Sequence, residues 1–96
     1  MIEYLSQIDA FLDKKTDLWT FYNWFQEAYF GDEGADVRRS FKQDEMSLLE
    51  GLNDLLAYAG TNPTQEERDN GIMDEDQFRD RLGLLKKKNI LIWERS

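Results

Sequence analysis

The sequence predicts an all-α fold: a four-helix bundle of short antiparallel helices with an apolar C-terminal tail packed on it. Apolar residues recur at intervals of three and four in several segments, as they do along one face of a helix. Turn signals separate these segments at Gly31, Gly60 and residues 69–71. All 96 residues are expected to form one domain, because a chain of this length supports a single hydrophobic core.

The first two helices are expected at about residues 2–14 and 17–30, joined tightly enough to form an antiparallel hairpin. Lys14 and Lys15 suit the C-terminus of the first helix, and Thr16 or Asp17 can cap the second. The second helix is apolar on most sides, so we predict that it is the most buried helix. Its expected stripe is Leu18, Phe21, Tyr22, Phe25 and Tyr29, widened by Trp19, Trp24 and Phe30.

The loop 31–34 follows, and its spacing does not match an EF-hand, so we interpret it as a charged turn without calcium. A third helix is predicted at residues 44–59, where leucines repeat at helical spacing, and Phe41 could extend it upstream. Gly51 lies inside this helix at a cost of about 1 kcal/mol relative to alanine. This cost indicates either the close approach of a neighbouring helix or simple tolerance, and we favour tolerance.

The polar stretch 61–71 connects the third helix to the fourth. Thr64 and Glu67 have capping-box spacing, which predicts a short helical turn, and Asp74 and Gln77 repeat that spacing. The fourth helix should then continue to residues 86–88, three lysines suited to a helix C-terminus. The apolar run 90–93 is too short to distinguish a strand from a helical turn, and we expect it to fold back onto the bundle.

The charge and the composition limit the classes of function that we expect. The net charge is −8, and the acidic excess lies before residue 86, whereas residues 86–96 are net positive. Such a surface repels nucleic acids and anionic membranes and attracts a basic partner, although acidic charge can also serve solubility alone. The chain has no histidine or cysteine and no nucleotide-binding or zinc motif, so we expect neither an enzyme nor a cofactor or metal site. Without a candidate membrane span or signal peptide, a cytoplasmic location is expected.

Acidic residues gather around the connection between the third and fourth helices. Helix capping and solvated charge explain Asp74, Glu75 and Asp76 well but explain Glu66, Glu67 and Asp69 less well. This acidic patch is therefore also a candidate partner site. Aromatic residues left exposed beside the acids would be interface anchors, with Tyr58 the first candidate and Trp24 the second. The acidic set is Glu66, Glu67, Asp69, Asp74, Glu75 and Asp76.

A family resemblance is carried by the order of several segments: residues 2–4 and 8–12, a Thr16 start to an aromatic helix, a leucine-rich third helix, residues 60–68 and residues 73–75. This order resembles the bacterial self-protective immunity proteins of the colicin D type, whose relatives include immunity proteins of contact-dependent growth inhibition systems. The resemblance implies a four-helix bundle that binds a cognate toxin, commonly a tRNA-cleaving nuclease, and covers its basic active-site cleft with acidic side chains. By position, it assigns toxin contacts to Glu50, Asp54, Glu66, Glu67 and Asp69.

Two alternatives remain open at this point. An acidic mimic of nucleic acid would block a host DNA-binding or restriction protein, and it predicts a long stripe of acids. An acidic adaptor subunit predicts an exposed leucine face on one helix. In each case we expect a protein partner, no direct contact with nucleic acid or membrane, and a monomeric free protein.

Overall fold

The computed structural model describes residues 1–32 and 34–96, and no strand occurs among these residues. Glu33, in the predicted 31–34 turn, lies outside the described residues. The predicted all-α fold is confirmed, and no described helix is long and apolar enough to cross a membrane. The helices are α1 (Ile2–Leu12), α2 (Leu18–Phe30), α3 (Gly34–Arg39), α4 (Gln43–Ala57), α5 (Gln65–Asp69), α6 (Glu75–Lys88) and α7 (Ile90–Glu94).

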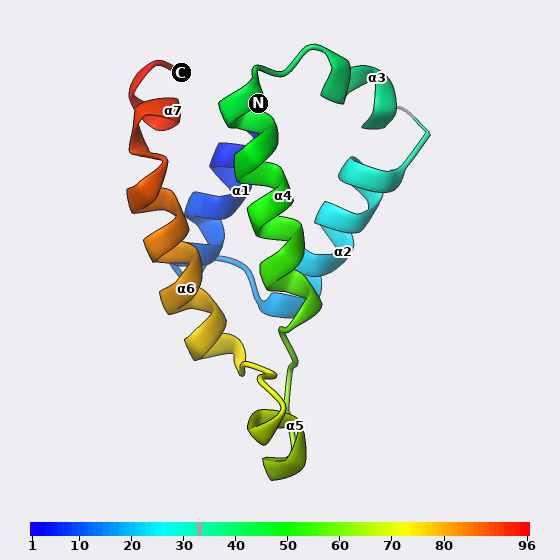
Figure 1. Ribbon diagram of the computed structural model, residues 1–96, viewed down its shortest axis with the longest axis vertical. Helices are drawn as coiled ribbons and strands as arrows, with labels where there is room; N and C mark the ends of the chain where they lie inside the picture. Colours follow the sequence, from blue (N-terminus) through cyan, green and yellow to red (C-terminus); the bar gives the residue numbers. More distant parts are fainter. Residues whose placement is uncertain (33) are drawn as a thin grey trace.

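The four longer helices form the bundle and alternate in direction. In Figure 1, α1 and α4 run downwards, whereas α2 and α6 run upwards. The closest packing between elements joins α4 to α6, α1 to α6 and α2, and α3 to α2. Consecutive long helices are therefore antiparallel, and the short connection 13–17 requires this of α1 and α2. The short helices α3 and α5 lie in the connections between the long helices, and α7 follows the last of them.

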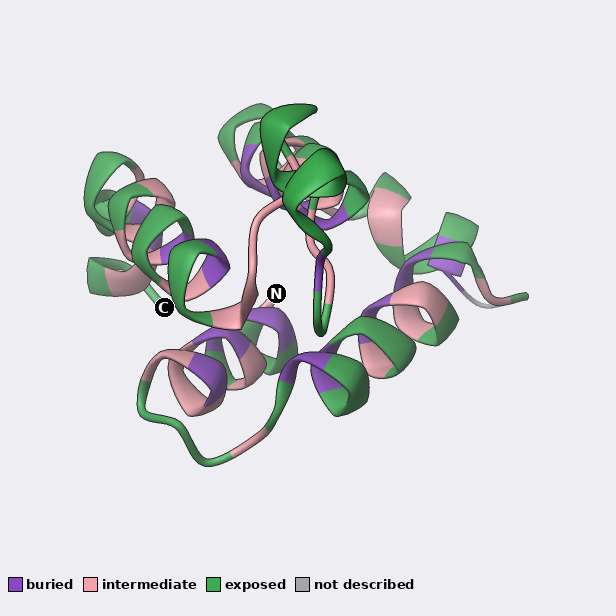
Figure 2. Cartoon of the chain, turned by 90° about the horizontal axis from the view of Figure 1, so that it is seen from below, coloured by how far each residue is buried: buried purple, intermediate pink, exposed green. Residues whose placement is uncertain are grey.

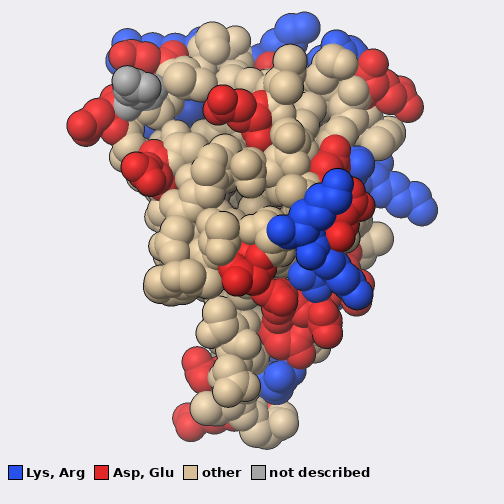
Figure 3. Space-filling view, turned by 180° about the vertical axis from the view of Figure 1, so that it is seen from behind, with Lys and Arg blue, Asp and Glu red and all other residues tan. Residues whose placement is uncertain are grey.

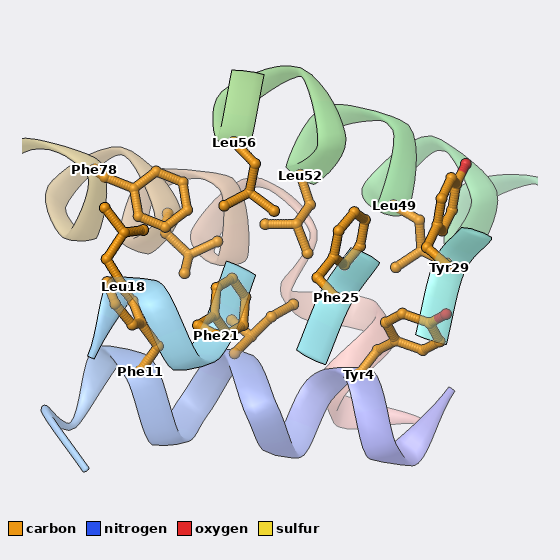
Figure 4. Packing of buried hydrophobic residues seen from close by; sticks show 12 residues of the cluster. Tyr4, Phe11, Leu18, Phe21, Phe25, Tyr29, Leu49, Leu52, Leu56 and Phe78 are labelled. Carbon is orange, nitrogen blue, oxygen red and sulfur yellow. The ribbon is translucent and has the colours of Figure 1, made fainter. Parts of the chain in front are cut away.

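Aromatic rings from three helices meet at one end of the core. The ring centre of Phe11 lies 5.2 Å from that of Phe21 and 5.3 Å from that of Phe78, and Phe21 and Phe78 are 6.3 Å apart. All three side chains are buried, and Leu56 of α4 lies nearby in the same cluster (Figure 4). Burying a phenylalanine side chain contributes about 1.5–3 kcal/mol, so this cluster is a main source of stability.

The prediction that α2 is the most buried helix is wrong. Its buried stripe is Leu18, Phe21, Phe25 and Tyr29, and no other residue of the helix is buried. Tyr22, predicted on this stripe, is exposed, as are Trp19 and Phe30. The reason is geometric: α2 lies on the flank of the bundle, so one stripe meets the other helices and the opposite face meets solvent (Figure 1).

The helix α3 was not anticipated, because six residues are too few for a periodic signal. It packs against α2, where the guanidinium of Arg38 lies 4.6 Å from the ring centre of Tyr29, a cation–π contact. Phe41 does not extend α4 as proposed. It lies before the helix and packs edge-on against Tyr4, with ring centres 5.9 Å apart.

The C-terminal tail packs on the bundle as expected and forms the helical turn α7. Ile92 is only 1% exposed and lies in a cluster with Leu5 and Leu48. The indole Nε1–H of Trp93 donates to both carboxylate oxygens of Asp9 at 3.2 Å. The ammonium of Lys86 binds the same carboxylate at 2.7 Å and lies 5.3 Å from the Trp93 ring centre.

Gly51 lies where α4 packs against Leu85 of α6, as the first of its two interpretations expects, and the favoured interpretation of tolerance stays a prediction. A Cβ atom at this position would lie 3.2 Å from Leu85 Cδ1, closer than ordinary van der Waals contact. A helical glycine costs stability through backbone entropy, and here that cost allows the two helices to pack closely. Gly83 of α6 differs, because a Cβ atom there would sit 3.9 Å from Leu12 Cδ2, an ordinary contact.

Docking of the tail can be measured with two substitutions one residue apart. Ile92→Ala should lower the free energy of unfolding by about 2–5 kcal/mol, because it empties a fully packed site. Leu91→Ala should change it by less than about 0.5 kcal/mol, because Leu91 is 68% exposed. Urea unfolding followed by circular dichroism gives both values, and equal effects would mean that the tail does not pack as described.

The two helical glycines provide a second matched test. Gly83→Ala should raise the free energy of unfolding by about 0.5–1 kcal/mol, because alanine favours the helix and its Cβ fits. Gly51→Ala should gain clearly less or lose stability, because Leu85 must move. The same unfolding measurement applies, and an equal gain at both positions would contradict the tight α4–α6 contact.

Candidate functional site

Residues 58–74 leave the bundle, form α5 and return, and we call them the acidic arm. The arm is closed at its base, where Gly60 N–H donates to the Met73 carbonyl at 2.8 Å and Met73 N–H donates to the Tyr58 carbonyl at 2.7 Å. Gly71 adopts a positive φ of 94° in the return turn, as the turn signal predicts. Every residue of α5 is exposed (Figure 2), so the arm projects beyond the end of the bundle (Figure 1).

Two of the predicted site residues, Glu67 and Asp74, cap helices within the arm. The Glu67 carboxylate accepts from Thr64 N–H at 2.9 Å, and Thr64 Oγ1 accepts from Glu67 N–H at 3.2 Å. The Asp74 carboxylate accepts from Gln77 N–H at 2.8 Å, and Gln77 Oε1 accepts from Asp74 N–H at 3.0 Å. Both predicted capping boxes are therefore confirmed.

Hydrogen bonds to these two carboxylates also shift their titration. Backbone and side-chain bonds from Thr64 lower the pKa of Glu67, and the backbone bond from Gln77 followed by the contact with Arg68 lowers the pKa of Asp74. The Arg68 guanidinium lies 2.9 Å from Asp74 and links α5 to the start of α6. Both carboxylates are thus ionised at neutral pH and stabilise the arm.

Glu75 and Asp76, the next two predicted site residues, are also engaged within the molecule. Glu75 accepts a hydrogen bond from Leu18 N–H and so ties the start of α6 to the start of α2. The Arg79 guanidinium lies 3.0 Å from Asp76 and 3.7 Å from Glu75. Helix ends and ion pairs therefore account for Asp74 to Asp76, leaving their carboxylates less available to a partner than free ones.

The remaining predicted site residues point outward. Glu50, Asp54 and Tyr58 follow one another at intervals of four along α4 and its C-cap, and all three are exposed. We call these three residues the α4 ridge. Tyr58 is 54% exposed, as expected of an interface anchor, and no described residue bonds to its hydroxyl or to the carboxylates of Glu50 and Asp54.

The tip of the acidic arm carries the other two outward-facing acids. Glu66 has no hydrogen-bond or ion-pair partner among the described residues, and Asp69 accepts one bond, from Gln65 Nε2 at 2.9 Å. The arm follows directly from the C-terminal end of α4, so the α4 ridge and the arm tip lie in succession along the molecule (Figure 1). Together they present four exposed carboxylates and one exposed tyrosine.

The second predicted anchor, Trp24, is not exposed, so that expectation is wrong. Its ring packs edge-on against Tyr4, with ring centres 5.2 Å apart, and it supports the core. The exposed tryptophan is Trp19, at 65%, which the sequence analysis assigned to the apolar arc of a buried helix. The exposure of Trp19 could have been predicted from spacing, because residue 19 falls outside the stripe 18, 21, 25 and 29 that α2 buries.

Two long segments of the chain contain no positively charged residue. No Lys or Arg occurs in residues 16–37 or 43–67, segments that contain α2, α4 and the first half of the acidic arm. In Figure 3, the face over α2 is mostly tan and its charged atoms are red, whereas blue atoms gather at the top and on the opposite side. Residues 43–67, which include the α4 ridge and the outgoing half of the arm, therefore contribute no Lys or Arg to the surface.

Within the described residues, no group of three or more His, Cys, Asp or Glu side chains is arranged to hold a metal ion. The carboxyl groups with a clear pKa shift, Asp17, Asp44, Glu67 and Asp74, are all shifted downward by hydrogen bonds or by Arg95 and Arg68. Charged carboxylates accept hydrogen bonds and pair with cations.

Comparison of the chain with protein-family models, with curated proteins and with solved structures finds no match. The resemblance to colicin D-type immunity proteins therefore stays a prediction that these comparisons do not test.

The lowered pKa values predict a specific acid sensitivity. A carboxyl group whose pKa is lower in the folded state adds stability above its unfolded pKa and loses it as pH falls through the folded value. The free energy of unfolding should therefore fall between about pH 5 and pH 2, and it should fall less in Asp74→Asn. Urea unfolding at several pH values measures this dependence.

Asp54→Asn is the matched control for this experiment, because no described residue bonds to the Asp54 side chain. It should retain the acid dependence of the wild type. Identical acid dependence in Asp74→Asn and wild type would show that the cap and the Arg68 contact do not link Asp74 to folding.

Proposed function

We propose that this chain is an immunity-type inhibitor that neutralises a basic nuclease toxin by placing acidic side chains in the toxin's active-site cleft. The observation that carries the proposal is the outward-facing acids of the α4 ridge and of the arm tip, together with the absence of Lys and Arg from residues 43–67. Its outward carboxylates are those of Glu50, Asp54, Glu66 and Asp69, with Tyr58 among them.

Electrostatics supports this assignment. A nuclease cleft is positively charged because it binds phosphates, and a protein of net charge −8 is steered toward such a cleft by long-range attraction. The projecting arm adds shape complementarity, because a convex acidic element can enter a concave basic site. The capped ends of α5 and the closed base give the arm a defined conformation, which lowers the entropy cost of binding.

An acidic adaptor subunit is the second candidate, and one observation favours it. Leu84 of α6 and Leu91 of α7 are both large and exposed, and Lys87 and Lys88 lie between them in the sequence. Exposed leucines of this kind are typical of a surface that contacts another subunit. The two candidates place the partner on different surfaces, so they can be separated by mutation.

A pull-down with the tagged protein from a lysate of its source, at low and high salt, tests the proposed function. We expect one basic nuclease-like partner that high salt displaces only weakly. In Glu66→Lys/Asp69→Lys, association with this partner should slow and become less salt-sensitive, because rim charges steer encounter. On the α4 ridge, truncation of whichever carboxylate of Glu50 and Asp54 pairs with a buried toxin cation should cost about 2–5 kcal/mol.

Asp13→Lys/Glu94→Lys is the matched control for the arm variant. It makes the same change in net charge at two exposed positions outside the α4 ridge and the arm, and it should retain affinity and toxin neutralisation. If charge reversals at the α4 ridge and the arm leave neutralisation unchanged, the site assignment is wrong. Loss of the partner on Leu84→Asp or Leu91→Asp alone would instead favour the adaptor.

A further inference from the structure

A groove of about 410 Å³ lies between α2 and the C-terminal end of α4, beside the α4 ridge. Its walls are Trp19 and Tyr22 on one side and Ala57, Gly60 and Thr61 on the other. None of the described residues that line it is charged. The buried side chains of Leu18 and Leu56 also contribute to the lining, so apolar side chains form much of an uncharged groove.

The groove is bordered by aromatic groups without a partner in the molecule. Trp19 is 65% exposed and Tyr22 is exposed as well, and no described residue bonds to the Trp19 indole N–H or the Tyr22 hydroxyl. Rings of this kind offer a large apolar area together with one hydrogen-bonding group, which is the usual composition of an interface anchor site. Neither ring belongs to the buried core, to which α2 contributes Leu18, Phe21, Phe25 and Tyr29.

The charge around the groove indicates what kind of segment would occupy it. Asp54 lies three residues before Ala57 on α4, and residues at this spacing are neighbours on a helix surface. No Lys or Arg lies in α2, in α4 or in the residues 58–67 that continue from the groove into the acidic arm. An apolar side chain flanked by cations therefore complements both the groove and its rim.

A second groove lies on the other side of the α4 ridge, between α4 and α6, and it differs in chemistry. Its lining includes Gln77, Asp80 and Arg81, so it presents an acid and a cation, whereas none of the residues that line the α2–α4 groove is charged. A basic segment would meet Arg81 there. The α2–α4 groove is therefore the one suited to such a segment.

We propose that the α2–α4 groove receives one aromatic or aliphatic side chain from a basic segment of the partner protein. The inference rests on the proposed function and adds to it an apolar anchor beside the ionic contacts. Trp19 and Tyr22 form the wall that closes over this anchor, and Asp54 pairs with a neighbouring cation of the same segment. Specificity for the partner then depends on the groove, whereas the acids supply steering.

Two synthetic peptides serve as probes: acetyl-Lys-Lys-Phe-Lys-Lys-amide and its counterpart with serine in place of phenylalanine. Binding to the whole protein is followed by ¹H–¹⁵N NMR titration, using the Trp19 indole and the backbone amides of Tyr22 and Ala57. The phenylalanine peptide should shift these signals and bind at least tenfold more tightly than the serine peptide. In Trp19→Ala, the affinities for the two peptides should converge, with the Ala57 amide as the reporter.

Phe30→Ala is the matched control, because Phe30 is an exposed aromatic residue of α2 outside the groove. It should retain the preference for the phenylalanine peptide. The inference is overturned if both peptides bind equally, if neither binds at millimolar concentration, or if the shifts centre on Gln77 and Arg81 of the other groove.

The inference and the proposed function can fail separately. A preference for phenylalanine that depends on Trp19 supports the groove even if reversing the charges of the arm leaves the natural partner bound, which would contradict the toxin-inhibitor proposal. If arm reversal abolishes toxin neutralisation but Trp19→Ala does not alter peptide preference, the acidic surface stands and the apolar anchor falls.

Discussion

The rings of Phe11, Phe21 and Phe78 join α1, α2 and α6 at the end of the bundle from which the acidic arm projects (Figure 4). Each ring comes from a different helix, so loss of any one would loosen the mutual position of all three. Because α4 packs against α6 and Leu56 lies in the same core cluster, the aromatic cluster also positions the C-terminal end of α4. The candidate binding surface depends on this packing, since the α4 ridge, both grooves and the base of the arm lie at this end.

The acidic residues serve two different purposes. Glu67, Asp74, Glu75 and Asp76 accept backbone hydrogen bonds or pair with arginines, and they give the arm and the start of α6 their conformation. The α4 ridge and the arm tip instead direct carboxylates into solvent. There they change the free energy of folding little, and they can strengthen binding to a basic partner. Capping therefore holds the arm in shape while its other charges are presented, which links helix-end chemistry to the proposed inhibition.

Local sequence rules predicted the helices and their caps well, because these depend on residues three or four apart. Both capping boxes, the cap at Asp17, the glycine turn at residue 71 and the four long helices could be recognised from spacing alone. The same rules placed the acidic patch on the connection between the third and fourth helices. They missed α3, which is too short to show a period, and they could not separate strand from helix in the tail.

Long-range packing determined the remaining features, which no local pattern contains. The burial of α2 on one stripe only, the exposure of Trp19 and the partial burial of Trp24 follow from the flanking position of this helix. The contact of Gly51 with α6 and the binding of Trp93 and Lys86 by Asp9 join residues far apart in the chain. Composition and spacing thus specify an acidic helical bundle with a capped arm, whereas the choice of which apolar face stays uncovered depends on how the helices pack. That choice is physical in origin, because each helix can bury only the stripe that its neighbours reach.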